Sequence, residues 1–289
     1  MRSFVRRLTT GFFLTLVALA LPVGAQADVS ITFGVYTSDK PSAMVRQLRP
    51  TLDLVEQSIA ETLGEPVEIK LEVVRGYAAG AELILSGKAD VMRLGPASYV
   101  KVKGKEAGIE LLAMENKNGA NTFEGVIVVH ENSDITEMSQ LRGRTFAFGS
   151  KRSTLGRYFA QLELTRAGIL ASDLKSYEYL GRHDKVGQAV GAGLFDAGAL
   201  EGTMFKKLQA KGVPIRAIHI MRNATKAWAA RAGLDPHLKQ LVRQALLGIN
   251  DNRALTALRF DGFLPGHDSD YDPTRAAINR NSEFFDSKS

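Results

Sequence analysis

The segment GSKRSTLG, residues 149–156, combines residue types that can hold a small anion. It joins the end of a predicted strand to an amphipathic helical pattern, so Ser153 and Thr154 fall at the start of a helix. The first backbone N–H groups of a helix have no partner within the helix and carry partial positive charge, and hydroxyl groups there either cap the helix or bind an oxyanion. A plain N-cap and an anion site are equally compatible with this segment alone. A Walker loop is excluded, because no Gly-Lys pair is followed here by Ser or Thr.

The residue types of a hydrolase are present, but their spacing is not that of a hydrolase. Ser153 lies in no Gly-x-Ser-x-Gly turn, and Asp184 directly follows His183, where it is poorly placed to orient the imidazole. The other histidines form no i, i+4 pair, and the chain has no cysteine, so we expect no metal site and no cofactor. The sequence therefore favours binding over catalysis, and we predict that the protein is not an enzyme.

Strand and helix patterns alternate along the chain. β-rich runs predict strands at residues 29–36, 67–74, 89–95, 123–130, 141–149, 176–181, 195–200 and 215–220. Amphipathic patterns predict helices at residues 42–64, 77–87 and 184–192, and one that begins at Ser153. The phrases ILSGKADVMRLGP and VGAGLFDAGALEG follow one pattern, which suggests that two similar α/β units are present.

These patterns predict an α/β fold in which two lobes form a hinged clamp, each lobe a mainly parallel sheet flanked by helices. We predict one lobe from residues 28–125 and 222–289, and the other from residues 126–221. The strands at 123–130 and 215–220 are the expected crossings between the lobes, and the helical tail from about Asp235 is expected to pack on the first lobe. Ligands of such folds bind outside the carboxyl ends of the strands, so the site should lie between the lobes.

The N-terminus has the features of a cleaved secretory signal. Three arginines precede an uncharged apolar run at residues 11–21, and Ala25-Gln26-Ala27 provides a small-x-small cleavage site. The apolar run is shorter than the roughly 20 residues of a bilayer span. We therefore predict a signal peptide at residues 1–27 and a periplasmic location, with an uncleaved anchor as the alternative.

The charge balance argues against nucleic acid as a partner. The formal net charge of +6 falls by three, to +3, when the predicted signal peptide with its three arginines is removed. A nucleic-acid-binding protein would be expected to concentrate basic residues on one face, and the sequence shows no such concentration.

Three phrases carry a family resemblance. They are YAAGAELILSGKADVMRLGPASYV, then SDITEMSQLRGRTFAFGSKRSTLGRYFAQLELTRAGI, then YLGRHDKVGQAVGAGLFDAGAL. With them, residues 31–234 resemble the periplasmic phosphate/phosphite/phosphonate-binding proteins of ABC transporters. The resemblance implies a type II solute-binding fold, a small oxyanion as ligand and an ABC permease as partner.

The resemblance also implies which residues contact the ligand. A Ser-Thr-Ser-Gly segment holds the anion in such proteins, and residues 153–156 take its place here. His183 and Tyr77 match a histidine and a first-lobe tyrosine that reach the ligand. Polar residues that follow predicted first-lobe strands join them, although helix capping is an alternative role for these. The predicted ligand-binding residues are Ser153, Thr154, Leu155, Gly156, His183, Tyr77, Thr37, Ser38, Ser98 and Glu201.

Three departures from the family pattern bear on the ligand. Leu155 stands where a second serine is usual and so removes a hydroxyl donor, and Leu94 replaces an aromatic residue. Lys226 falls near the aspartate of members that bind aminophosphonates, where a lysine would repel an amine. Glu201 lies near another acidic position of those members. A small inorganic or simple organic oxyanion is therefore the expected ligand.

We expect a monomeric solute-binding protein that captures this oxyanion and delivers it to an ABC permease. The alternative is a sensor, in which the closed clamp is presented to a membrane histidine kinase or chemoreceptor.

Overall fold

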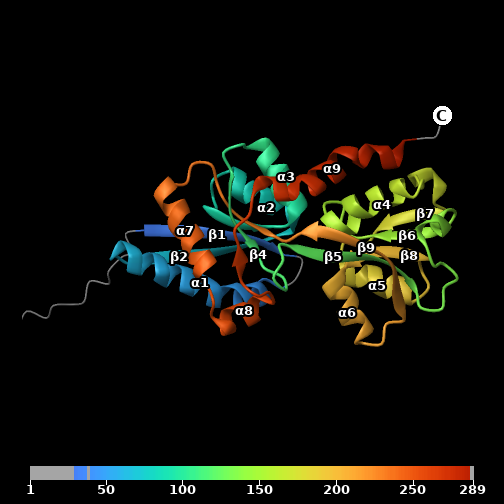
Figure 1. Cartoon of the computed structure of the whole chain (residues 1–289), viewed down its shortest axis with the longest axis horizontal. Helices are drawn as coiled ribbons and strands as arrows, with labels where there is room; N and C mark the ends of the chain where they lie inside the picture. Colours follow the sequence, from blue (N-terminus) through green and yellow to red (C-terminus); the bar gives the residue numbers. More distant parts are fainter. Residues whose placement is uncertain (1–28, 38–39, 287–289) are drawn as a thin grey trace, which may run out of the picture.

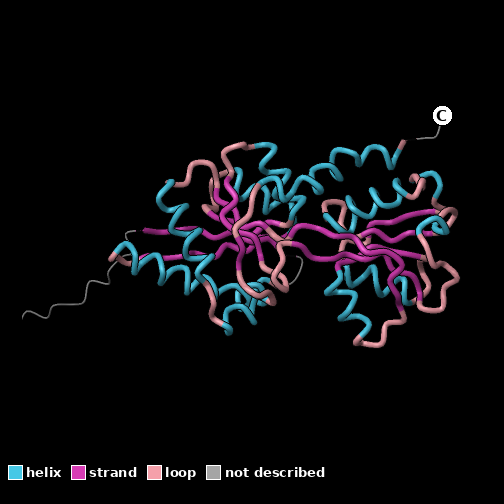
Figure 2. The backbone as a smooth tube through the Cα atoms, viewed as in Figure 1, coloured by secondary structure: helices cyan, strands magenta, loops and turns pink. Residues whose placement is uncertain are grey.

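The computed structural model describes residues 29–37 and 40–286, and these residues form two α/β lobes that lie end to end (Figure 1). In both lobes the strands run through the middle and helices cover the two faces (Figure 2). The predicted signal peptide and Ser38 lie outside the described residues. Within the described ranges, no helix is long and apolar enough to span a bilayer.

The first lobe is built on a six-stranded sheet with strand order β11-β4-β10-β3-β1-β2. Its strands are β1 (Val29–Thr37), β2 (Val67–Arg75), β3 (Val91–Leu94), β4 (Glu110–Glu115), β10 (Ala227–Ala230) and β11 (Phe263–Leu264). Its helices are α1 (Pro41–Leu63), α2 (Gly76–Leu85), α3 (Pro96–Lys105), α7 (Pro236–Gly248) and α8 (Asn252–Leu258).

Helix α1 illustrates how the sequence pattern builds this lobe. Leu48, Leu52, Val55 and Ile59 recur at helical spacing and are buried against the sheet. The helix ends at Gly64, whose φ of 73° lies in the left-handed region that glycine adopts without a Cβ clash. The predicted helix at 42–64 therefore matches the observed one closely.

The second lobe is built on a five-stranded sheet with strand order β7-β6-β8-β5-β9. Its strands are β5 (Thr122–His130), β6 (Thr145–Phe148), β7 (Ser176–Tyr179), β8 (Ala197–Glu201) and β9 (Ile215–Ala224). The main helices are η2 (Thr154–Phe159), which has π-helical turns, its continuation α4 (Ala160–Arg166), α5 (His183–Gly191) and α6 (Gly202–Gln209). Two short 3-10 turns, η1 (Met138–Leu141) and η3 (Ala171–Asp173), lie in the connections.

The predicted α/β fold with two lobes is confirmed, but both sheets are mixed rather than mainly parallel. In the first lobe β1 pairs in parallel with β2 and β3, whereas β10 pairs antiparallel with β3 and β4. In the second lobe β6 is parallel to β7 and β8, and β5 is antiparallel to β8 and β9. The reason is the double crossing: a chain that leaves a lobe and returns to it must run in opposite directions on its two passages.

The chain passes between the two sheets at residues 116–121 and 225–226, whereas the strands expected as crossings, at 123–130 and 215–220, lie within the second-lobe sheet. Strands β5 and β9 pair along their whole length in the second lobe. The crossings are joined to each other, because the backbone N–H of Thr225 donates to Asn121 O at 2.8 Å and that of Glu115 donates to Lys226 O at 3.2 Å. They form a two-stranded connection between the lobes, at the place where a hinge was expected.

The C-terminal tail divides between the lobes, which differs from the prediction that it packs on the first lobe. Helices α7 and α8 do contribute to the first-lobe core. The last elements, η4 (Asp268–Tyr271), α9 (Asp272–Asn279) and η5 (Arg280–Phe285), pass over to the second lobe (Figure 1). Phe284 is buried there, with its ring edge-on to Phe148 at 5.8 Å between centroids. The tail is thus a third connection between the lobes.

Candidate ligand-binding site

Five helices begin at the carboxyl ends of strands where the lobes face each other. Helices α2 and α3 begin on the first lobe, and η2, α5 and α6 on the second. The starts of these helices contain Tyr77, Ser98, Thr154, His183 and, as the N-cap of α6, Glu201. Unpaired N–H groups give each helix start a partial positive charge. The arrangement therefore provides a region of partial positive charge that favours an anion.

The two lobes touch directly at Thr154. Its Oγ1 accepts a hydrogen bond from the backbone N–H of Ala97, in the first turn of α3, at 3.0 Å. Both residues are buried. A second contact lies beside this one, where the Lys101 ammonium donates to the hydroxyl of Tyr158. Because Thr154 accepts from Ala97, its own O–H remains able to donate to a ligand oxygen.

On the first lobe, the hydroxyl of Tyr36, at the end of β1, accepts a hydrogen bond from a backbone amide in the same way as Thr154 does. This Tyr36 hydroxyl accepts from the backbone N–H of Gly95 at 2.8 Å and lies 3.0 Å from Ser98 Oγ. Burial raises the pKa of Tyr36, so the phenol is neutral and can donate a proton. Tyr36 was not among the residues predicted from the sequence, although a tyrosine at the end of a predicted strand, just before Thr37, is a signal that could have indicated it.

Ser153 caps η2 and links it to α5. Its Oγ accepts from the backbone N–H of Gly156 at 3.0 Å and lies 3.5 Å from His183 Nε2. Thus Tyr36, Ser153 and Thr154 each accept from an amide at a helix start, and this bond does not use the hydroxyl's own proton. Such chains polarise the O–H bond, which strengthens it as a donor to an anion.

Gly156 allows this close packing of η2 on its neighbours. A Cβ added there would lie 2.9 Å from the Cα of Gly149 and 3.1 Å from Cε1 of His183. The backbone N–H of Gly149 also donates to Gly156 O at 2.7 Å. Since backbone atoms cannot move aside easily, the glycine keeps the η2 start adjacent to α5.

The other predicted residues occupy different surroundings. Tyr77 packs its ring against Tyr36 at 4.9 Å, and burial raises the pKa of its phenol, an effect that the neighbouring Ser153 hydroxyl partly offsets. Thr37 is buried at the end of β1. The Leu155 side chain lies in the second-lobe core against Gly125, so only the Leu155 backbone faces the helix start. Glu201 is partly buried near His183, whose pKa its charge influences.

A buried ion pair lies behind the first-lobe side of the site. The Arg93 Nε donates to Glu115 Oε1 at 2.5 Å, and the same oxygen accepts from Trp228 Nε1 at 3.3 Å. Burial would raise the pKa of Glu115, but the charges of Arg93 and Lys226 and these hydrogen bonds outweigh that effect and hold the pKa below its usual value. Trp228 itself is fully buried, with its ring 4.7 Å from that of Phe33.

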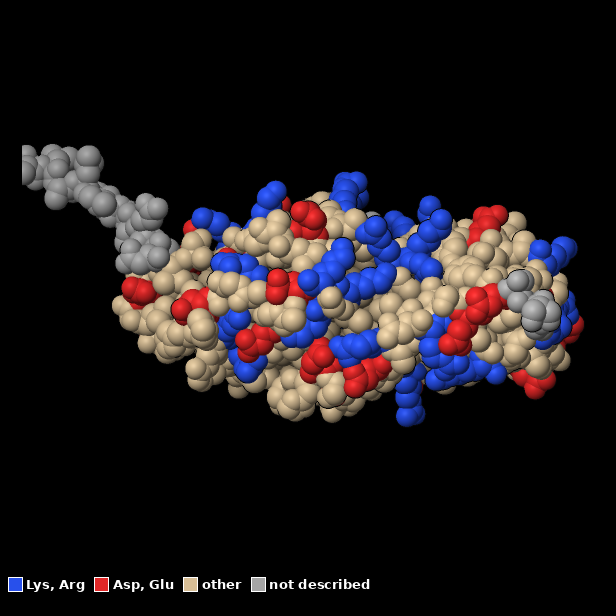
Figure 3. All heavy atoms as spheres, turned by 90° about the horizontal axis from the view of Figure 1, so that it is seen from above, with Lys and Arg blue, Asp and Glu red and all other residues tan. Residues whose placement is uncertain are grey.

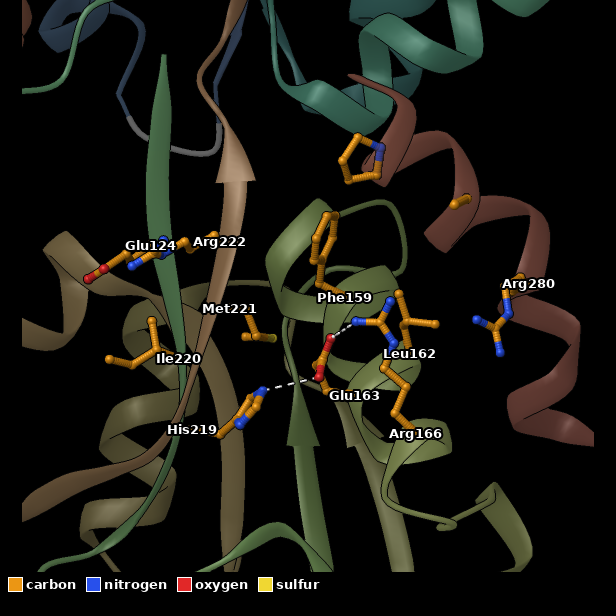
Figure 4. A pocket seen from close by; sticks show the side chains of 12 residues that line it. Glu124, Phe159, Leu162, Glu163, Arg166, His219, Ile220, Met221, Arg222 and Arg280 are labelled. Carbon is orange, nitrogen blue, oxygen red and sulfur yellow. Dashed lines mark hydrogen bonds and ion pairs between the residues drawn. The ribbon is translucent and has the colours of Figure 1, made fainter. Parts of the chain in front are cut away.

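A cavity of about 580 Å³ lies elsewhere, between β9, η2, α4 and α9 (Figure 4). Several of its charged groups are already paired. Glu163 accepts from Arg166 at 2.6 Å and lies 3.1 Å from His219 Nε2, and Arg280 pairs with Glu283 outside the cavity at 2.9 Å. Because its charges largely neutralise each other, this cavity is less suited to a small anion than the helix starts are.

Charges of both signs occur on the face that Figure 3 shows. On the face that carries α9, Lys and Arg are interspersed with Asp and Glu (Figure 3). Among the described residues, no group of three or more His, Cys, Asp or Glu could hold a metal ion.

The His183 imidazole should make stability depend on pH. Burial lowers its pKa below the ordinary value of 6.5, and repulsion by Lys226 acts in the same direction, against the opposing effect of Glu201 and Asp184. Between the lowered pKa and 6.5 the unfolded chain binds the proton and the folded protein does not. The free energy of unfolding should therefore fall as the pH drops below about 6.5.

This pH effect can be assigned by comparing the parent with His183→Gln. Melting temperatures measured from pH 8 to pH 5 at constant ionic strength should fall more steeply for the parent. Parallel curves for the two proteins would show that His183 is not buried in its neutral form.

Comparisons with known proteins match this architecture. Residues 33–271 match the family model described as the phosphonate ABC transporter periplasmic substrate-binding protein. The chain is 27% identical over 191 residues to the probable ABC transporter phosphite-binding protein PhnD1 of Prochlorococcus marinus, a match that covers 59% of this chain and 63% of that protein. The chain thus spans somewhat less than two thirds of the length of that relative.

Solved structures share the fold. The XAC2383 protein of Xanthomonas citri, bound to chloride, has a TM-score of 0.75 at 24% identity, covering 88% of this chain and 99% of that one. PhnD1 of Prochlorococcus marinus, in complex with methylphosphonate, has a TM-score of 0.73 at 18% identity, covering 88% and 98%. The family model covers most of the chain, and the chain shares the two-lobed fold of these solved structures. The protein therefore belongs to the family of periplasmic substrate-binding proteins of phosphonate ABC transporters.

Proposed function

We propose that this protein captures a small phosphorus oxyanion, of the phosphonate, phosphite or phosphate type, between its lobes and delivers it as a monomer to an ABC importer. The observation that carries the proposal is the meeting of helix starts from both lobes, α3 and η2, at the Ala97–Thr154 hydrogen bond. Family membership supports the transport role.

The site binds through polarised neutral donors. The hydroxyls of Thr154, Ser153 and Tyr36 donate to the anion's oxygens while each accepts from an amide at a helix start. Neutral His183 and Tyr77 flank them. Donors that are already oriented need little reorganisation, so they stabilise an anion without a formal positive charge beside it.

Entry of the ligand requires the lobes to separate at the hinge, because Thr154 and Ala97 are in contact. The ligand then binds donors on both lobes, which favours the closed arrangement over an open one by its differential affinity. The permease would recognise this closed arrangement. Ser153 Oγ lies 3.5 Å from His183 Nε2, but among the described residues no carboxylate binds His183 Nδ1 to orient the imidazole, so we propose binding without turnover.

A thermal-shift panel tests the proposal. Phosphate, phosphite, methylphosphonate, 2-aminoethylphosphonate, sulfate and simple dicarboxylates are added to the mature protein in separate samples. At least one phosphorus oxyanion should raise the melting temperature, because a ligand that binds only the folded form stabilises it. Stabilisation by sulfate or a dicarboxylate, with none by any phosphorus oxyanion, would contradict the proposal.

A further inference from the structure

Lys226 immediately precedes β10 and lies beside the end of β3, close to where α3 begins. Strands β3 and β10 are antiparallel, with Trp228 opposite Arg93 and Ala227 opposite Leu94. Lys226, one residue before β10, is therefore next to Gly95, where the chain turns into α3. Side chains two apart on a strand share a face, so Lys226 lies on the same face of the sheet as Trp228 and Arg93.

The nearby carboxylates do not pair with the Lys226 ammonium. Glu115 is already bound by Arg93 and Trp228. Glu201 acts on Lys226 by its charge, but among the described residues the ammonium makes no hydrogen bond or ion pair with it or with any other group. The side chain is partly buried, and Arg93 is buried with an exposed fraction of 7%. Two cations, Arg93 and Lys226, thus act on each other by charge, and only one of the two carboxylates that attract Lys226, Glu115, is bonded directly to either cation.

This arrangement is electrostatically unfavourable until a further anion arrives. Repulsion from Arg93, followed by burial, lowers the pKa of Lys226, against the attraction of Glu115 and Glu201. A partly buried cation without a bonded partner destabilises a protein, and a ligand anion would relieve that cost. The position also suits a ligand, because Lys226 is next to Gly95, whose backbone N–H donates to the Tyr36 hydroxyl of the proposed site at 2.8 Å.

We propose that the ligand carries a second anionic group, joined by a short linker to the phosphorus oxyanion, and that Lys226 binds this group with Arg93 behind it. The ligand class is then a phosphonate with a carboxylate or similar acidic group, and an aminoalkylphosphonate is disfavoured. The inference rests on the proposed function, since the phosphorus oxyanion itself is bound at Thr154 and Ser153.

Isothermal titration calorimetry at neutral pH tests this inference with three ligands that all carry a phosphonate group. Phosphonoacetate should bind the parent at least about tenfold more tightly than methylphosphonate, as expected for one charge-assisted hydrogen bond. The amine of 2-aminoethylphosphonate should make that ligand the weakest. Lys226→Met should remove the advantage of phosphonoacetate and leave methylphosphonate binding within about threefold of the parent. Lys226→Arg should retain the advantage.

A stability measurement separates this role from a structural one. Without ligand, Lys226→Met should melt at the same temperature as the parent or higher, because it removes the repulsion from Arg93. A clear loss of stability would overturn the inference, since it would show that Lys226 is held by a protein partner.

The binding measurements also distinguish failure of this inference from failure of the proposed function. Equal affinity of the parent for phosphonoacetate and methylphosphonate would overturn it while leaving the proposed function intact. An equal loss for both ligands in Lys226→Met would mean that the lysine serves lobe closure, through Glu201, rather than the second group. If none of the three ligands bound, the proposed function itself would fail.

Discussion

Thr154→Val should weaken binding of the phosphorus oxyanion by about 1–3 kcal/mol, or roughly 5- to 150-fold in Kd. Valine keeps the shape of threonine but removes Oγ1. Two hydrogen bonds are then lost in the bound state: the one that Thr154 donates to the ligand and the one that it accepts from Ala97 N. The buried Ala97 amide is left without a partner, which further disfavours closure of the lobes.

Isothermal titration with the best ligand of the thermal-shift panel measures the change, and Thr154→Ser is the matched control. Serine retains the hydroxyl, so its Kd should stay close to that of the parent. An unchanged Kd in Thr154→Val would take this hydroxyl out of the site, and an equal loss in both variants would assign the effect to packing at this position rather than to the hydroxyl.

Glu115→Ala should lower the free energy of unfolding of the first lobe by about 3–5 kcal/mol, because breaking a buried ion pair leaves an uncompensated charge. The side chains of Arg93 and Glu115 are 8% and 9% exposed. Removal of the carboxylate leaves the Arg93 guanidinium facing Lys226 and deprives Trp228 Nε1 of its acceptor. The double variant Arg93→Met/Glu115→Met should recover most of the loss, since neither buried charge of the pair remains.

Urea unfolding followed by the fluorescence of Trp228 reports on this lobe. Glu68→Ala is a suitable control, because Glu68 pairs with Lys70 at 3.4 Å on the surface of the same lobe, with both side chains more than half exposed. Its effect should be below about 1 kcal/mol. Comparable effects of Glu115→Ala and Glu68→Ala would contradict a buried, strongly coupled pair.

Local patterns in the sequence determined much of the architecture. The helical spacing of Leu48, Leu52 and Val55 with Gly64 as terminator predicted α1, and the β-rich run at 123–130 predicted β5, because each element depends on neighbours within a few residues. The hydroxyls of Ser153 and Thr154 were recognisable at a helix start for the same reason. Strand β10 was missed: its sequence AWAA has weak strand character, and it is fixed only by pairing with β3 and β4.

Only the tertiary structure decided which groups meet. The pairing of Thr154 with Ala97 joins residues 57 positions apart, and that of Arg93 with Glu115 and Trp228 depends on register across three strands. The course of the tail over the second lobe depends on where Phe284 finds a buried surface, and the antiparallel strands depend on the double crossing. Local patterning specifies each element because its cause lies along the chain, whereas contacts between distant residues are set by how all the elements pack together.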